Sequence, residues 1–117
     1  MTGSRIAIAR SAGEDGDVLE LRGELDLTNA QALEDALGQT SSETVVVDLT
    51  RVTFLDSAGM RALDHAHRRF TDAGRRLRLV APPGSAAAWT FRVAGFSEDL
   101  VLGSADGAAS PAQEGVS

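Results

Sequence analysis

Residues 47–60 read Val-Asp-Leu-Thr-Arg-Val-Thr-Phe-Leu-Asp-Ser-Ala-Gly-Met, and this stretch decides how the chain folds. The β-branched run Val45–Val47 is typical of a strand that is covered on both faces. A short connection then leads to the polar pair Asp56-Ser57, and both residue types favour the start of a helix. We therefore predict a buried central strand from Thr44 to Leu49 and a helix that begins at Asp56-Ser57.

The predicted helix after residue 57 is amphipathic. Helical spacing places on one face Met60, Leu63, His67 and Phe70, and turns away from it Arg61, Asp64 and Arg68. Gly74 is expected to end the helix. A further strand is predicted from Leu77 to Val80, and the breaker Pro82-Pro83-Gly84 precedes a third helix from about Ser85 to Val93.

The amino-terminal part predicts a β-hairpin. Residues 5–9 and 18–22 have strand character, the second with alternating apolar and polar side chains. Residues 14–17, Glu-Asp-Gly-Asp, lie between them, and Asp-Gly supplies the backbone conformation that tight hairpins need. We therefore expect these two strands to be antiparallel neighbours.

A first helix is expected after the hairpin. Thr28 and Gln31 have the spacing of a capping box, in which the two side chains satisfy backbone groups of the first turn. The apolar side chains that follow share one helical face and are Ala30, Leu33, Ala36 and Leu37. Gly38 offers a stop, so the sequence predicts a short amphipathic helix that begins at Thr28.

The carboxyl-terminal part is less regular. We expect Trp89 to pack in the core with Ala86, Val93 and Phe96, since a lone aromatic residue at helical spacing is usually buried. Residues 96–102 predict a last short element. From residue 103 the side chains are small and polar with no apolar period, which predicts a disordered tail over 103–117 after one domain over 1–102.

The order of these elements is β-β-α-β-α-β-α, with a possible final strand. Helices that alternate with strands require parallel crossovers, while the hairpin adds an antiparallel pair. The sequence thus predicts a single α/β domain in which helices pack against a mixed central sheet. A length of 117 residues fits one such domain.

Composition restricts the cellular compartment and the classes of binding partner that we expect. The chain has no cysteine, begins without a signal-peptide pattern and has no apolar run long enough to span a bilayer. Its net charge of −6 disfavours non-specific binding to nucleic acid or anionic lipid. We expect a cytoplasmic protein with no nucleic-acid partner and no membrane insertion. We interpret a local cluster of basic residues as a solvated, positively charged surface. The cluster comprises Arg68, Arg69, Arg75, Arg76 and Arg78.

Ser57 is the candidate of most interest. The helix that follows it begins with the small residues Ala58 and Gly59, which leave the hydroxyl and the backbone accessible. A helix N-terminus has unsatisfied N–H groups and partial positive charge, so a phosphate on Ser57 would be well placed. Asp and Ser are also the preferred N-caps. The residues alone therefore leave a helix cap and a phosphate-accepting switch both open.

Three segments, in order and at fitting distances, resemble the STAS family, the domain shared by anti-sigma-factor antagonists and the tails of sulfate transporters. Residues 23–26, Gly-Glu-Leu-Asp, are similar to the family's segment before its first helix. Residues 47–49 with Val52 and Phe54 are similar to its central strand and turn. Residues 56–60, Asp-Ser-Ala-Gly-Met, are similar to its Asp-Ser-x-Gly-Leu/Met signature. The resemblance spans about residues 5–102 and is strongest to the free-standing antagonists.

This resemblance implies a function. Ser57 takes the place of the family's phosphorylation site, flanked by Asp26 and Asp56. The implied partner is an anti-sigma factor with a kinase-type ATP-binding fold and serine kinase activity, opposed by a serine phosphatase, and no cofactor is implied. The unphosphorylated chain would bind that partner and free a sigma factor. The implied partner-binding residues are Asp26, Thr28, Asp56, Ser57, Ala58, Gly59, Met60 and Arg61.

Catalysis is disfavoured by the residues themselves. Ser57 lacks the Gly-x-Ser-x-Gly pattern of a hydrolase nucleophile. His65 and His67 are two apart on a helix, so they cannot jointly hold one metal. Asp48 has no evident acidic partner for acid–base work. We therefore expect no enzyme and no catalytic or metal-binding residue.

Two binding functions also compete. A nucleotide-binding module would need a glycine-rich phosphate loop, and residues 84–86 offer only a turn without the Walker lysine, since the chain has no lysine. A STAS protein that serves as a constitutive adaptor, for instance as the small subunit of a lipid-transport ATPase, would use Ser57 merely as a cap. A phosphorylation assay separates this adaptor from the switch.

Overall fold

The computed structural model describes residues 6–14, 16–94 and 101–102. Its elements, in chain order, are β1 (Ile6–Ala12), β2 (Gly16–Leu25), α1 (Ala30–Gly38), β3 (Thr44–Leu55), α2 (Ser57–Asp72), β4 (Arg76–Val80), α3 (Ala86–Ala94) and β5 (Val101–Leu102). The predicted α/β order is confirmed, and its optional last strand is present. Phe96 and the predicted tail over 103–117 lie outside the described residues.

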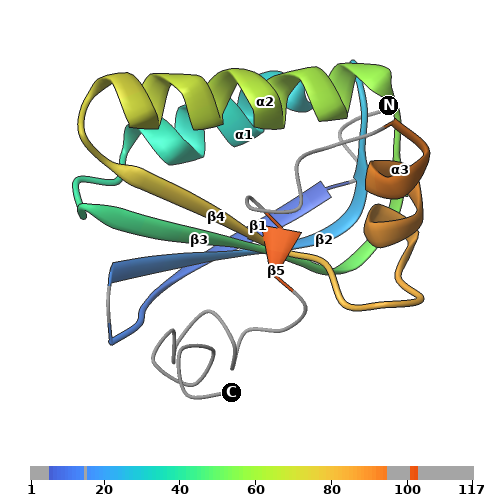
Figure 1. Ribbon diagram of the computed structural model, residues 1–117, viewed down its shortest axis with the longest axis horizontal. Coiled ribbons are helices and arrows are strands. Elements are labelled where there is room, and N and C mark those ends of the chain that lie inside the picture. The colour runs from blue at the N-terminus through green and yellow to red at the C-terminus, as the bar shows by residue number, and fades with distance from the viewer. Residues whose placement is uncertain (1–5, 15, 95–100, 103–117) are drawn as a thin grey trace.

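The strands form one sheet in the order β1-β2-β3-β4-β5. β1 and β2 pair antiparallel as the hairpin pattern predicted, whereas β2, β3, β4 and β5 are parallel neighbours. The sheet is therefore mixed, with β3 at its centre. Figure 1 shows α1 and α2 side by side over one face of this sheet, while α3 packs against β3 at the end where α2 begins.

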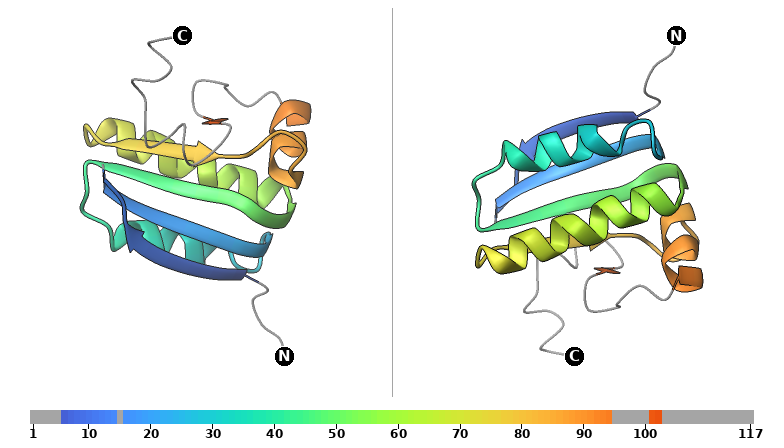
Figure 2. Two further views of the ribbon diagram at one scale, coloured as in Figure 1. Left: turned by 90° about the horizontal axis from the view of Figure 1, so that it is seen from below. Right: turned by 90° about the horizontal axis from the view of Figure 1, so that it is seen from above.

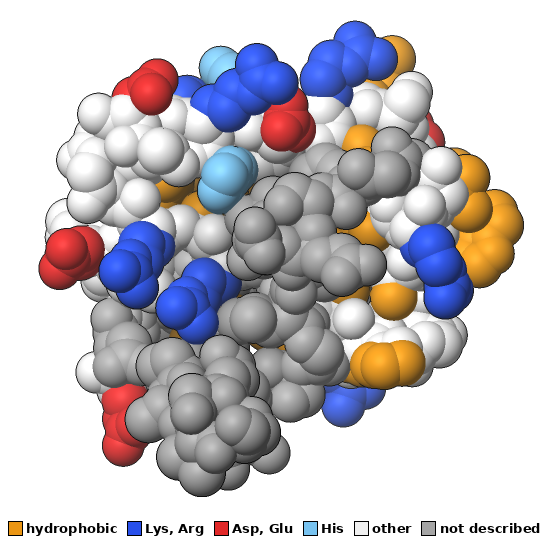
Figure 3. Space-filling view, viewed as in Figure 1, with side chains coloured by type: hydrophobic (Ala, Val, Ile, Leu, Met, Phe, Trp, Pro, Cys, Tyr) orange, Lys and Arg blue, Asp and Glu red, His pale blue; other side chains and the backbone are white. Residues whose placement is uncertain are grey.

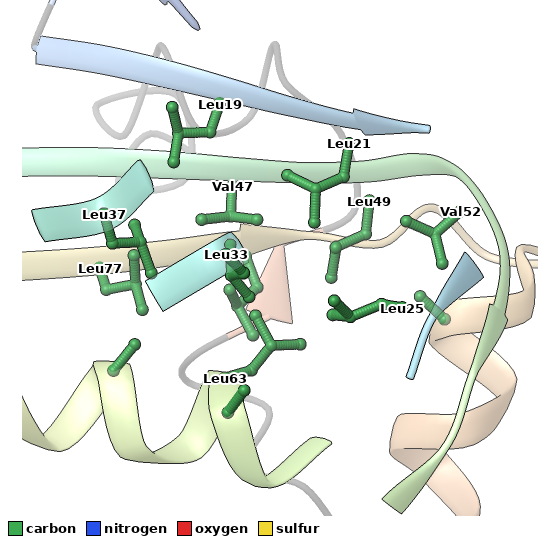
Figure 4. Close-up of a cluster of buried hydrophobic side chains, with 14 of the residues drawn as sticks. Leu19, Leu21, Leu25, Leu33, Leu37, Val47, Leu49, Val52, Leu63 and Leu77 are labelled. Carbon is green, nitrogen blue, oxygen red and sulfur yellow. The ribbon is translucent and has the colours of Figure 1, made fainter. Parts of the chain in front are cut away.

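The core lies between the sheet and these two helices. Figure 4 shows Leu33 of α1 and Leu63 of α2 meeting Leu21 and Val47 of the sheet. All four side chains are fully buried. On α2 the spacing predicted the burial of Leu63 and Phe70 correctly, but Met60 and His67 are only half-buried. The small residues Ala62 and Ala66 fill the centre of the buried face instead.

β3 is twice as long as the sequence predicted. It continues through Leu55, so the connection expected between the strand and Asp56 does not exist. Val52 and Leu55 are both buried, and the ladder to β2 continues to the pair Leu25 and Leu55 across two register irregularities. Cross-strand pairing therefore overrides the polar residues that suggested a loop. The helix α2 follows the strand directly.

The capping box at Thr28 and Gln31 is wrong. Helix α1 begins at Ala30 with Asn29 in the N-cap position and no side-chain cap. The Thr28 hydroxyl donates to Asp26, and Gln31 Nε2 donates to a carboxylate one turn later in α1. Hydrogen bonds within the preceding turn, and not the capping preference of Thr, fix where this helix starts.

The prediction that Trp89 packs in the core is also wrong. Helix α3 buries Ala87 and Phe91, while Trp89 is 61% exposed and Val93 67% exposed. Residues four apart share one helical face. The helix therefore presents one apolar face to the sheet and a second one, with the tryptophan, to its surroundings.

Candidate functional site

The candidate site lies where β2 and β3 end. Because these strands are parallel and Leu25 is paired with Leu55, the residues that follow them, Asp26 and Asp56, emerge at the same edge of the sheet. The Asp56 amide donates to the Leu25 carbonyl at 3.3 Å, which joins the two strand ends. Figure 2 shows both strand ends and the first turn of α2 together at this end of the molecule.

Asp56 caps helix α2. Its Oδ1 accepts a hydrogen bond from the Gly59 amide at 2.9 Å, and its carbonyl accepts from the Met60 amide at 2.9 Å. Ser57 is the first helical residue, its side chain is exposed, and its hydroxyl has no hydrogen-bond partner among the described residues. The two roles that the sequence left open are thus divided: Asp56 is the cap, and the Ser57 hydroxyl is free of that task.

The turn that carries Asp26 is held by side chains. Asp26 Oδ1 accepts from the Thr28 amide at 2.9 Å and from the Thr28 hydroxyl at 2.6 Å. The Asp26 amide donates to Asn29 Oδ1 at 3.0 Å, and the buried Asn29 amide group donates to the Glu24 carbonyl at 2.8 Å. The Asp26 carboxylate is therefore fixed in position at the rim of the site.

Gly59 explains how closely the helix approaches the sheet. It is buried, and a Cβ atom built on it would lie 2.7 Å from the Leu25 carbonyl oxygen and 2.7 Å from Leu55 Cδ1. Only glycine fits there without movement of the backbone. The family resemblance implied that Gly59 belongs to the partner surface, and the structure gives it a packing role against Leu25 and Leu55.

The remaining site residues differ in accessibility. Ala58 and Met60 are half-buried and Arg61 is exposed. Two large apolar residues at these strand ends were not predicted to belong to the site. Leu27, between Asp26 and Thr28, is 78% exposed, and Phe54, near the end of β3, is 50% exposed. An apolar side chain inside an otherwise polar turn was the available signal for Leu27. For Phe54 there was no signal, because its outward direction depends on the extension of β3.

The other candidates have structural roles. His65 Nδ1 lies 3.3 Å from Glu34 on α1, and Arg69 pairs with the same carboxylate, which links the two helices. Arg75 stacks over the Phe70 ring at 4.1 Å and donates to carbonyl oxygens of the loop before β3. Asp48 accepts from the amide and the hydroxyl of Thr50.

Metal-binding groups and membrane-spanning helices are considered for the described part of the chain, 6–94 without residue 15 and with 101–102. No group of three or more His, Asp or Glu side chains there is placed to hold a metal ion. No helix within those residues has the length and apolarity to cross a bilayer.

A pair of substitutions tests which of Asp56 and Ser57 caps the helix. Asp56→Ala removes the acceptor of the Gly59 amide, and we expect it to lower the free energy of unfolding by about 1 kcal/mol. Ser57→Ala removes an exposed hydroxyl that has no partner in the described part of the chain, so its effect should stay within about 0.5 kcal/mol. Urea unfolding measures both. The reverse order of effects would identify Ser57 as the cap.

Comparison with known proteins identifies the domain type. A family model described as "Mlab, STAS domain" matches residues 8–103. The Anti-sigma-F factor antagonist RsfB of Mycobacterium tuberculosis is 43% identical over 49 residues, which are 39% of this chain and 40% of that relative. The match therefore spans about two-fifths of the relative's length.

Solved structures extend the similarity to the whole domain. The crystal structure of an anti-sigma factor antagonist from Mycobacterium paratuberculosis has a TM-score of 0.76 at 26% identity, over 86% of this chain and 88% of that one. Unphosphorylated SpoIIAA has a TM-score of 0.68 at 19% identity, over 92% and 97% of the two chains. Phosphorylated SpoIIAA of Bacillus has a TM-score of 0.58 at 21% identity, over 82% and 89%. The SpoIIAA similarities show the fold alone.

Proposed function

Because the chain belongs to the STAS domain family, we propose that it is an anti-sigma-factor antagonist. Its unphosphorylated form binds an anti-sigma factor of kinase-type fold in the cytoplasm and releases the sigma factor that this partner holds. The serine kinase activity of the partner then phosphorylates Ser57 and ends the complex. A serine phosphatase restores the hydroxyl and with it the binding.

The free hydroxyl of Ser57 carries this proposal. It is exposed at the first position of α2, and Asp56 already supplies the cap that would otherwise occupy it. An exposed hydroxyl that has no partner among the described residues can enter a kinase active site without breaking a contact with that part of the fold. The names of the mycobacterial relatives, both antagonists of anti-sigma factors, support the same function.

The site accounts for why a phosphate acts on binding and not on folding. Phosphorylation adds about −1.5 to −2 charges and three acceptor oxygens. At the start of a 16-residue helix these charges meet the positive end of the helix dipole, so the domain itself tolerates them. A protein of this fold, SpoIIAA, has solved structures in both phosphorylation states, which supports that tolerance.

The docking partner meets a different environment. Asp26 and Asp56 already place two carboxylates at the adjacent ends of β2 and β3, and Ser57 follows Asp56 directly. A partner that fits these carboxylates must also accept the phosphate in an interface from which water is excluded. Unfavourable charge at a closing interface costs several kcal/mol. The surface that we propose to contact the partner comprises Asp26, Thr28, Asp56, Ser57, Ala58, Met60 and Arg61, with Gly59 packed beneath it.

Phosphorylation itself is the first test, because it also separates the switch from a constitutive adaptor. We expect incubation with ATP and the cognate anti-sigma kinase to add one phosphoryl group, located on Ser57 by peptide mass spectrometry. The Ser57→Ala chain is the matched control and should gain none. Modification at another residue, or none in the wild-type chain, would favour the adaptor.

The tolerance of charge is tested separately. We expect Ser57→Asp to retain the wild-type circular dichroism spectrum and an unfolding free energy within about 0.5 kcal/mol, because the residue is exposed. A melted spectrum would instead make loss of structure the mechanism of the switch.

A further inference from the structure

The outward face of α3 is the part of the surface that the proposed switch leaves unexplained. Trp89 and Val93, one turn apart, are 61% and 67% exposed, while Ala87 and Phe91 hold the helix to the sheet. Large exposed apolar groups of this kind mark interaction sites, and tryptophan is the residue most enriched among those that dominate binding energy. The opposite face already anchors the helix, so this one is available for a partner.

This face lies next to the phosphate-accepting site. Figures 1 and 2 show α3 at the same end of the molecule as the first turn of α2 and the ends of β2 and β3. Leu27 and Phe54 are exposed apolar residues of those same strand ends. In the space-filling view of Figure 3, apolar and basic side chains gather along this end of the molecule. The outward face of α3 therefore lies at the same end of the molecule as the proposed interface.

Two other ways of covering the face are disfavoured. Residues 103–117 contain only one large apolar side chain, Val116, so this tail has little to bury against a tryptophan. A second copy of the chain would carry the same net charge of −6. A two-fold interface centred on α3 would also set the exposed Arg92 of one copy near that of the other.

We infer, on the basis of the proposed function, that the outward face of α3 is a second contact zone for the same anti-sigma factor. Trp89 inserts into an apolar depression of that partner, and Arg92 meets a carboxylate at its rim. This zone supplies affinity that does not depend on the state of Ser57. The contacts around Ser57 supply the part of the affinity that phosphorylation removes.

The test uses the fact that the chain has a single tryptophan. With 5-fluorotryptophan incorporated, the full chain gives one fluorine resonance, which reports on Trp89 whatever the partner contains. We expect this resonance to shift on addition of the purified kinase-type anti-sigma factor of the same organism. Trp89→Ala should weaken the complex about tenfold or more in calorimetry, and equally in the Ser57→Ala chain. Since Trp89 is exposed, the variant should keep the wild-type circular dichroism spectrum.

The matched control is Arg68→Ala, an exposed residue near the far end of α2, which should leave the affinity unchanged. The inference is overturned if the wild-type chain binds in calorimetry but its fluorine resonance does not shift. It is also overturned if Trp89→Ala binds with the wild-type affinity. Either result leaves the proposed function intact. A shift that depends on the concentration of the chain alone identifies a second copy as the occupant and also overturns the inference. Absence of binding by the wild-type chain overturns both proposals.

Discussion

Ser57→Asp should bind the kinase-type anti-sigma factor about 100-fold more weakly than Ser57→Ala, a difference of about 3 kcal/mol. The aspartate puts a third carboxylate beside Asp26 and Asp56 at an edge where the partner must exclude water. Alanine adds no charge and removes a hydroxyl that has no partner within the described domain. Isothermal titration calorimetry at one ionic strength measures both affinities.

Salt dependence provides the control for this prediction. If charge causes the difference, part of it should diminish as salt screens the exposed carboxylates. Asp64→Asn changes the charge by one unit on α2, away from the strand ends. It should leave the affinity within a factor of about three, because an exposed charge outside the interface contributes little. Equal affinities of Ser57→Asp and Ser57→Ala would refute the electrostatic switch.

Gly59→Ala should lower the free energy of unfolding by about 1–3 kcal/mol, the usual range for overpacking. The added methyl group would lie 2.7 Å from the Leu25 carbonyl oxygen, a backbone atom that cannot move alone. The first turn of α2 must therefore shift away from β2. Because Ser57 is on that turn, we also expect weaker binding to the partner. Urea unfolding and calorimetry provide the two measurements.

Gly38→Ala is the matched control for this substitution. Gly38 is also helical, at the end of α1, but a Cβ atom there would have no neighbour within 4 Å. Alanine has the higher helix propensity, so this variant should be neutral or more stable by up to about 1 kcal/mol. Equal destabilisation by both variants would show that steric contact with Leu25 is not the reason for glycine at residue 59.

Much of the fold followed from local patterns. The valine run of β3 and the spacing of Leu33 and Leu37 on α1 identified buried elements, because burial on one or both faces imposes a period on the sequence. The Asp-Gly turn identified the hairpin. These signals act within a few residues, so a single sequence displays them.

Specific side-chain hydrogen bonds and packing against the sheet explain what the sequence patterns missed. Thr28 and Asn29 are both good N-caps, and only the bonds of Asn29 to the Asp26 amide and the Glu24 carbonyl decide between them. Which face of α3 packs on β3 depends on where the sheet lies, so the exposure of Trp89 was not evident from helical spacing.

The candidate site was proposed from the sequence, and its geometry was not evident from the sequence alone. The pair Asp56-Ser57 correctly marked the start of α2, yet capping preference alone cannot say which of the two residues is the cap. The hydrogen bond from the Gly59 amide to Asp56 makes that assignment. The need for glycine at residue 59 comes from Leu25, which is distant in sequence and adjacent only after β2 and β3 pair.

The most direct test compares the enzymatically phosphorylated chain with the untreated one, binding to the same purified anti-sigma factor, with circular dichroism recorded for both. The account predicts identical spectra and an affinity about 10²- to 10³-fold lower for the phosphorylated chain. Equal affinities of the two forms, or a loss of binding that accompanies loss of structure, would contradict it.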